Sequence, residues 1–302
     1  MGRCLHPLAL FRAAACCLAP IAAAASQVDD LVADVAANGS LALGLSASLS
    51  SSTTTSSGQQ VQPRALWAFQ YGRVRLSTGG AAAVLGIAQD PRGPGASAEL
   101  FSGEQLRMGV ALRIDRGRNS SSIEGLEGLP DVPATLRTRA YASYALTPNW
   151  TLAGSVSQDV LGRGGGTVAT ADLGYLAPLT PASEWYAGTG LTWVDQRYMN
   201  SYYGVSPESS ASTGLAAYAP GAGPANLRAG IGFTAALSSH WVLFGGAGVT
   251  CLVGYAADSP LTKERVGKSV SIGLAYRWGT RYDRLTSVLL PPTETPAPHP
   301  PR

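Results

Sequence analysis

Charged residues are scarce in this chain, and those present nearly cancel. Only 14% of the 302 residues are charged, with 22 Lys and Arg against 19 Asp and Glu. A disordered chain would be richer in charge and poorer in aromatic residues, and a coiled coil would be dominated by Ala, Glu, Lys, Leu and Arg. Nucleic-acid binding requires concentrated positive charge, which a net charge of +3 does not supply. These three classes are therefore excluded.

Cysteine and histidine are also few. Three of the four cysteines lie in the first 25 residues, which leaves Cys251 alone in the rest of the chain. One cysteine forms neither an internal disulfide nor a thiolate metal cage. Beyond residue 25 the histidines are His240, in a predicted turn, and His299, near the C-terminus, and no HExxH motif is present. Since Asp258 is only an isolated candidate calcium ligand, we expect no metal, no cofactor and no enzymatic activity.

Long hydrophobic runs are absent beyond the N-terminal segment, so the sequence predicts no transmembrane helix. In that segment, Arg3 and Arg12 accompany an apolar stretch at 13–25, which ends in three alanines suited to cleavage. This pattern predicts a secretory signal peptide at 1–25 that is removed on export. A retained anchor helix, or lipidation at Cys16, is the alternative interpretation.

The rest of the sequence shows apolar–polar alternation with a period of two, over segments of about ten residues, the length of a tilted membrane-crossing strand. In 268–278, every second residue from Val270 to Trp278 is apolar, and the residues between them are small or polar. Such alternation predicts β-strands with one apolar face. The predicted strands are 40–49, 61–70, 72–78, 80–89, 104–114, 134–147, 149–160, 167–178, 184–195, 225–237, 240–252 and 268–278.

A soluble β-sandwich alternates in the same way, but three features favour a membrane barrel. The polar faces are Gly-rich, small or charged, as a wet lumen requires; the number of predicted strands, twelve, is even; and from the sixth predicted strand onward short and long connections alternate. In such barrels the short turns face the periplasm. We therefore predict an all-β fold, a closed antiparallel transmembrane β-barrel of about 12 strands over 39–278, with a periplasmic lead at 26–38 and a Pro-rich periplasmic tail at 279–302.

Tryptophan recurs at the ends of the predicted strands. Leu146 and Trp150 flank one short polar turn, and Leu237 and Trp241 flank another. Ordinary hairpins also use such turns, but a Trp in the same place each time suits a girdle at the lipid–water boundary. The predicted interfacial aromatics are Trp150, Trp185, Trp241 and Trp278.

Two loop segments carry a resemblance to a known family. Residues 193–205 read WVDQRYMNSYYGV, and residues 256–261 read AADSPL. Together they resemble the loops of the MipA/OmpV family of outer-membrane proteins (MltA-interacting-protein-like), although Tyr203 stands where a phenylalanine is usual. The resemblance covers 105–278 well and 26–104 loosely. The residues that carry the family loop motifs are Trp193, Asp195, Tyr198, Met199, Tyr202, Tyr203, Gly204, Val205, Asp258, Ser259 and Pro260.

The resemblance implies an outer-membrane protein of a Gram-negative bacterium. The family is named for a member that scaffolds a murein-synthesising complex, bridging a lytic transglycosylase (a murein hydrolase) and a bifunctional penicillin-binding protein, and other members look like porins or surface adhesins. Such barrels usually stop at a terminal aromatic residue, whereas 24 residues follow Trp278 here. Six of the last twelve residues are Pro, which favours an extended polyproline conformation.

Charged residues on the polar faces of the predicted strands are expected to point into the lumen. They fit either an anion-preferring pore or a set of internal ion pairs that fill a narrow barrel, and the second interpretation is favoured. The predicted lumen charges are Arg137, Arg139, Asp159, Asp172, Arg228 and Arg277.

These patterns together predict a non-enzymatic outer-membrane β-barrel. The predicted role is that of a scaffold or interaction protein linked to murein (peptidoglycan) synthesis and hydrolysis, and a small porin-like channel or a surface adhesin is the alternative. The expected partners are outer-membrane lipid and, through the resemblance, a murein hydrolase and a penicillin-binding protein.

Overall fold

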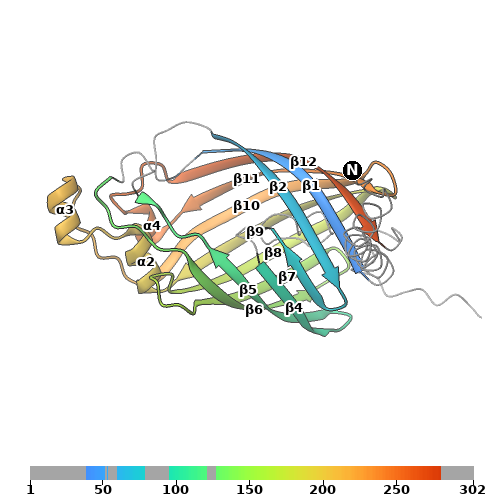
Figure 1. Cartoon of the computed structure of the whole chain (residues 1–302), viewed down its shortest axis with the longest axis horizontal. Helices are drawn as coiled ribbons and strands as arrows, with labels where there is room; N and C mark the ends of the chain where they lie inside the picture. The colour runs from blue at the N-terminus through green and yellow to red at the C-terminus, as the bar shows by residue number, and fades with distance from the viewer. Residues whose placement is uncertain (1–38, 52, 54–59, 79–94, 121–126, 280–302) are drawn as a thin grey trace, which may run out of the picture.

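The structure is a computed structural model that describes residues 39–51, 53, 60–78, 95–120 and 127–279. Its main feature is a closed antiparallel barrel of twelve strands, in which each strand pairs with its neighbours in sequence and β1 pairs with β12 to close the sheet (Figure 1). The strands are β1 (Gly39–Ser50), β2 (Gln60–Tyr71), β3 (Val74–Ser77), β4 (Gly95–Ser102), β5 (Leu106–Asp115), β6 (Thr135–Ala145), β7 (Trp150–Asp159), β8 (Thr167–Thr180), β9 (Ser183–Val194), β10 (Gly223–Ala236), β11 (Trp241–Leu252) and β12 (Val266–Gly279).

The barrel wall follows the alternation of the sequence. On β12, Val270, Ile272 and Leu274 are exposed on the outer surface, while Gly273 and Ala275 between them are buried. Large apolar side chains are exposed in the same way on most of the other strands, for example Leu45 on β1. In water such a surface would be highly unfavourable, whereas lipid accepts it. The prediction of a closed barrel with an apolar outer face is confirmed.

Short and long connections separate to opposite ends of the barrel. The end that carries the short connections, called here the turn end, holds residues 72–73, 103–105, 146–149, 181–182 and 237–240. The opposite end, called here the loop end, carries the connections that follow β1, β3, β5, β7, β9 and β11. The described residues of these connections are 51, 53, 78, 116–120, 127–134, 160–166, 195–222 and 253–265. β1 begins and β12 ends at the turn end. This separation is the one that barrels with periplasmic turns show.

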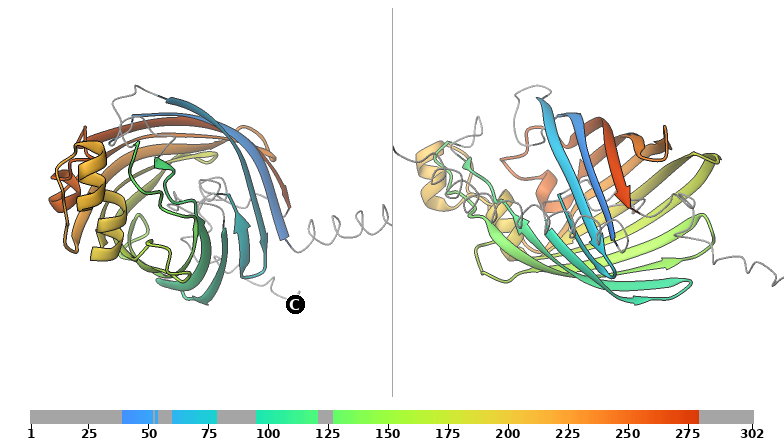
Figure 2. Two further views of the ribbon diagram at one scale, coloured as in Figure 1. Left: turned by 60° about the vertical axis from the view of Figure 1, so that its left-hand side comes forward. Right: turned by 45° about the vertical axis from the view of Figure 1, so that its right-hand side comes forward.

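Within the described residues, three helices lie at the loop end, and helical ribbon is visible at that end in yellow in Figure 2. They are α2 (Gln196–Tyr203) and α3 (Pro207–Thr213), both between β9 and β10, and α4 (Gly254–Ala257), between β11 and β12. Asp195 begins α2 by accepting a hydrogen bond from the backbone N–H of Tyr198, and Ser206 begins α3 in the same way through Ser209. No helix in the part of the chain that the structure describes is long and apolar enough to span a bilayer.

The first half of the barrel departs from the predicted strand list. β3 has four residues, so it pairs with only part of β2 and of β4. The predicted strand at 80–89 lies outside the described residues. The fourth strand described is β4, at Gly95–Ser102, where the alternation predicts no strand because the sequence GASAELFS is rich in small residues. The predicted signal peptide at 1–25, the lead at 26–38 and the tail beyond Gly279 also lie outside the described residues.

Candidate functional site

The lumen contains a cavity of about 1220 Å³ that reaches from the loop end toward the turn end. Small and polar side chains form most of its wall, as the inward alternation of the strands requires. Its charged lining residues are Arg64, Arg113, Asp115, Arg116, Arg137, Arg139, Asp172, Glu184 and Arg228.

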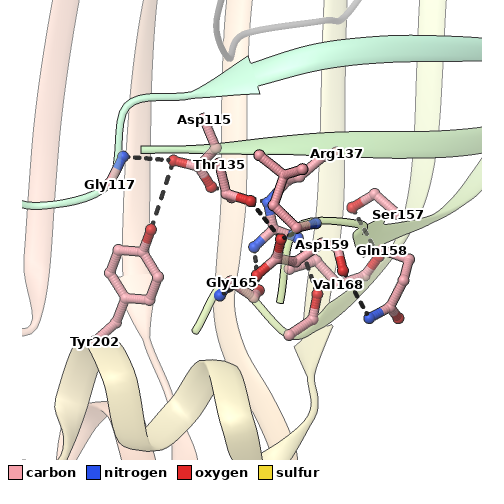
Figure 3. A network of polar contacts seen from close by, with 12 residues as sticks. Asp115, Gly117, Thr135, Arg137, Ser157, Gln158, Asp159, Gly165, Val168 and Tyr202 are labelled. Carbon is pink, nitrogen blue, oxygen red and sulfur yellow. Dashed lines mark hydrogen bonds and ion pairs between the residues drawn. The ribbon is translucent and has the colours of Figure 1, made fainter. Parts of the chain in front are cut away.

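Arg137, on β6, is the centre of a polar network at the loop end of this lumen (Figure 3). Its Nε donates to Oδ2 of Asp115 at 2.8 Å, and its other nitrogens donate to the carbonyl oxygens of Gly165 and Gly166. The guanidinium also lies over the ring of Tyr198, 5.5 Å from its centroid. The carboxylate of Asp115, the two loop carbonyls and the Tyr198 ring together hold the guanidinium in one position. Arg137 is therefore a structural cation and not a free charge in the lumen.

Asp159, at the end of β7, anchors the loop that follows it. Its carboxylate accepts hydrogen bonds from the backbone N–H groups of Leu161, Gly162 and Gly165 at 3.0, 3.0 and 2.8 Å. It also accepts from the hydroxyl of Thr135 (Figure 3). The carboxylate is therefore satisfied by its own loop and holds the glycine-rich segment 162–166 in place.

A second ion pair spans three strands. Arg228 on β10 binds Asp172 on β8, and it also donates to the hydroxyl of Thr192 at 2.9 Å. Between the two charged residues lies Gly190 on β9, in register with both. A Cβ at Gly190 would collide with the carboxylate of Asp172 and the guanidinium of Arg228, so glycine is required there. The interpretation that lumen charges pair internally is supported at both Arg137 and Arg228.

The two remaining predicted lumen charges are placed differently. Arg139 lines the cavity, two residues along β6 from Arg137, and it is in contact with a partner. Arg277, on β12, is in register with the inward-facing Ala42 near the turn end, and it also has a partner. The structure therefore divides the predicted set between the loop end, the cavity wall and the turn end.

The helix α2, formed by the first family motif, covers part of the lumen at the loop end. Met199 is fully buried in an apolar cluster with Val168, Val194, Leu252 and other residues of β8–β11 and α4. On the other face of the helix, the stacked rings of Tyr198 and Tyr202 line the cavity. Burial against the barrel rim holds the helix, and its two tyrosines form part of the cavity wall at the loop end.

Tyr202 connects this helix to the loop 116–134. Its hydroxyl donates to Oδ1 of Asp115 at 3.5 Å, and its carbonyl oxygen accepts from Arg118 at 2.9 Å. Burial, together with the charge of Asp115, raises the pKa of the Tyr202 phenol, and burial lowers the pKa of Arg118. A tyrosine phenol is protonated at neutral pH, and the raised pKa extends this state to more alkaline pH, so Tyr202 is a hydrogen-bond donor to Asp115.

The two family motifs, which are far apart in the sequence, contact each other. The hydroxyl of Ser259 donates to the carbonyl oxygen of Tyr203 at 2.6 Å and accepts from the N–H of Leu261 at 3.1 Å. Val205 and Leu261 are buried together in a second apolar cluster, beside Pro260. Gly204 ends α2, and Asp258 ends α4 and pairs with Arg265 at 3.1 Å. The motif residues therefore build one ordered unit at the loop end.

Trp193 is an exception among the motif residues, because it points outward from β9 and is exposed. The predicted interfacial aromatics lie on the outer face at the turn end, in two groups. Trp150 and Trp185 both contact the ring of Tyr175, and Trp241 and Trp278 both contact the ring of Tyr276. Aromatic side chains therefore mark the outer face at both ends of the barrel, as interfacial rings do.

His240 lies in the turn between β10 and β11. Its Nδ1 shares a hydrogen bond of 2.8 Å with Ser239, and its ring stacks on Tyr276. Within the described ranges, no group of three or more His, Cys, Asp or Glu side chains is placed to hold a metal ion.

The sequence analysis does not identify two candidate residues of the lumen, Asp115 and Glu184. Asp115 lies at the end of β5 and pairs with Arg137, although the two are 22 residues apart and no local pattern connects them. Glu184 lies at the start of β9, next to Trp185, and points into the lumen. Its inward position follows from the alternation of β9, which was the available signal.

This architecture, a closed sheet with an apolar exterior and a polar interior, defines an outer-membrane β-barrel. The family described as MltA-interacting protein MipA matches residues 43–278, so the chain belongs to the MipA family. No curated protein sequence matches the chain significantly.

Several solved structures of outer-membrane proteins are similar to this chain at low sequence identity and low TM-score. OmpT of Vibrio cholerae is 8% identical, with 80% of this chain and 97% of that chain covered and a TM-score of 0.39. The COG4313 outer-membrane channel of Pseudomonas putida F1 is 12% identical, with 80% and 95% covered and a TM-score of 0.41. The translocator domain of the autotransporter NalP of Neisseria meningitidis is 11% identical, with 86% and 96% covered and a TM-score of 0.35.

Proposed function

We propose that this protein is a non-enzymatic scaffold of the outer membrane that holds a murein hydrolase and a murein synthase at the periplasmic, turn end of the barrel. The family description names an interaction with MltA, which supports a protein partner of this kind. The observation that carries the proposal is the position of α2 across part of the loop-end mouth of the lumen, where the ring of Tyr198 lies against the guanidinium of Arg137. A barrel built for solute flow would keep this mouth open.

A pull-down experiment tests the scaffold. The folded full-length protein is immobilised and offered a purified lytic transglycosylase and a bifunctional penicillin-binding protein, separately and together. We expect both to be retained by the wild type and by Glu208→Gln, an exposed substitution at the loop end. Deletion of residues 280–302, which follow β12 in the sequence, is expected to weaken retention. Absence of retention by the wild type would contradict the scaffold.

A small channel is the second candidate, because the lumen holds a cavity of about 1220 Å³ with more arginines than carboxylates in its wall. Planar-bilayer recording separates the two functions. The scaffold predicts no discrete conductance steps. Steps whose ion selectivity changes in Arg228→Gln would favour the channel instead, since that substitution removes a cavity charge.

A further inference from the structure

Glu184 is a buried carboxylate that has no hydrogen-bond or ion-pair partner among the residues that the structure describes. It lies at the start of β9, lines the lumen cavity and is only 3% exposed. Its Oε2 is buried and has no hydrogen-bond partner in the structure. Buried carboxylates are normally paired or hydrogen-bonded, because removal of a charge from water without compensation is costly.

The other carboxylates of the cavity wall are compensated. Asp115 binds Arg137, and Asp172 binds Arg228. The Arg228 pair lies level with Gly190, six residues along β9 from Glu184, which is about 20 Å along a strand. Glu184 therefore lies well apart from the loop-end arginines, toward the turn end of the cavity.

One aromatic side chain, Tyr186, lies on the same inner face of β9 as Glu184, two residues along the strand. The strand register pairs Glu184 with Thr234 on β10. Tyr186 lies in the next row, with its ring directly over Gly232, where a Cβ would overlap it. An unpaired carboxylate near an aromatic ring is a combination that recognises an organic ammonium group, by charge and by cation–π attraction.

We propose that the turn-end part of the lumen, formed by Glu184, Tyr186 and Thr234, is a binding site for an organic ammonium ligand. The ammonium group takes the position opposite the Glu184 carboxylate, and its alkyl substituents contact the ring of Tyr186. The site does not depend on the proposed scaffold function.

Calorimetric titration of the folded full-length protein in a non-ionic detergent, at low salt, tests the site. The probe is choline, and its neutral isostere 3,3-dimethylbutan-1-ol serves as the uncharged comparison. We expect the wild type to bind choline and to bind the neutral alcohol at least tenfold more weakly. Glu184→Gln, which keeps the shape and removes the charge, is expected to bind choline at least tenfold more weakly.

Glu208→Gln is the matched control, because it removes the same charge from an exposed position in α3 at the opposite end. Its choline affinity is expected to equal that of the wild type. Heat-modifiable migration in gels checks that each variant is folded. The proposal is overturned if the wild type does not bind choline, if the neutral alcohol binds as tightly, or if Glu184→Gln binds choline as the wild type does.

Discussion

At the scale of single residues, burial decides what each charge in this barrel does. Arg137 is buried and has an ion-pair partner, two carbonyl acceptors and an aromatic ring, whereas Arg265 makes an exposed ion pair with Asp258 outside the lumen. Exposed pairs add little to stability, while the loss of one member of a buried pair leaves an uncompensated charge. Loss of the arginine is therefore expected to reduce stability much more at the buried Arg137 pair than at the exposed Arg265 pair.

Arg137→Gln is expected to lower the free energy of unfolding by about 3 kcal/mol, because it leaves Asp115 and two loop carbonyls without their cation. The matched control Arg265→Gln is expected to lower it by less than about 1 kcal/mol. Guanidinium titration of the folded protein, followed by tryptophan fluorescence, measures both values. Equal effects of the two substitutions would contradict the structural role given to Arg137.

The sequence predicts the inward direction of Arg137, Asp172 and Arg228, because alternation fixes the face of each strand residue. It does not predict their pairing. Asp172 and Arg228 are 56 residues apart, and they meet only because the register puts Gly190 between them. Pairing depends on register, and register is a property of the closed sheet.

At the scale of elements, the loop end is a unit made from separate loops. Ser259 connects the segment after α4 to the end of α2, and Tyr202 connects α2 to the loop 116–134. Such a unit can open locally while the strand ladders stay intact, since its hydrogen bonds are not part of the barrel wall.

Ser259→Ala removes the hydrogen bonds to the carbonyl of Tyr203 and from the N–H of Leu261. We expect faster hydrogen exchange in 196–205 and 253–265, corresponding to a local loss of about 1–2 kcal/mol, with the strands unchanged. Ser212→Ala is the control, because its hydroxyl bonds only within α3. Unchanged exchange in both loop segments would show that Ser259 does not connect them.

The strands are predicted from alternation because outward residues face lipid and inward residues face a polar lumen. The helices α2, α3 and α4 are not predicted, since they are short and their stability comes from packing against the rim. Asp195 and Ser206 were the available signals, as each begins a helix with a side-chain hydrogen bond. The sequence analysis does not predict β4, because the small residues of Gly95–Ser102 give little difference in hydrophobicity between alternate positions.

At the scale of the whole molecule, the apolar surface is on the outside. Ile272 on β12 is 56% exposed on the outer wall, and Ser271 beside it lines the lumen cavity. A soluble protein of this size would bury such residues in a core. The fold is therefore stable only where lipid or detergent covers the outer wall.

Ile272→Arg is expected to destabilise the barrel by about 2–4 kcal/mol in bilayers and to reduce its insertion, because it places a charge on the lipid face. Ser271→Arg places the same charge in the wet lumen and is expected to have a much smaller effect. Folding into lipid vesicles, scored by heat-modifiable migration, compares the two. Similar folding yields for both variants would indicate that the outer face and the lumen face of the wall are in contact with the same solvent.

The most direct test of the account measures which solvent each face of the wall meets. Nitroxide labels are placed singly at Ile231, Ile272, Ser48 and Ser271, in a Cys251→Ser background, and the protein is reconstituted in bilayers. Labels at Ile231 and Ile272 are predicted to collide mainly with oxygen, which dissolves in lipid, and labels at Ser48 and Ser271 mainly with a water-soluble nickel chelate. The reverse order, or no difference between the two pairs, would contradict a lipid-facing exterior.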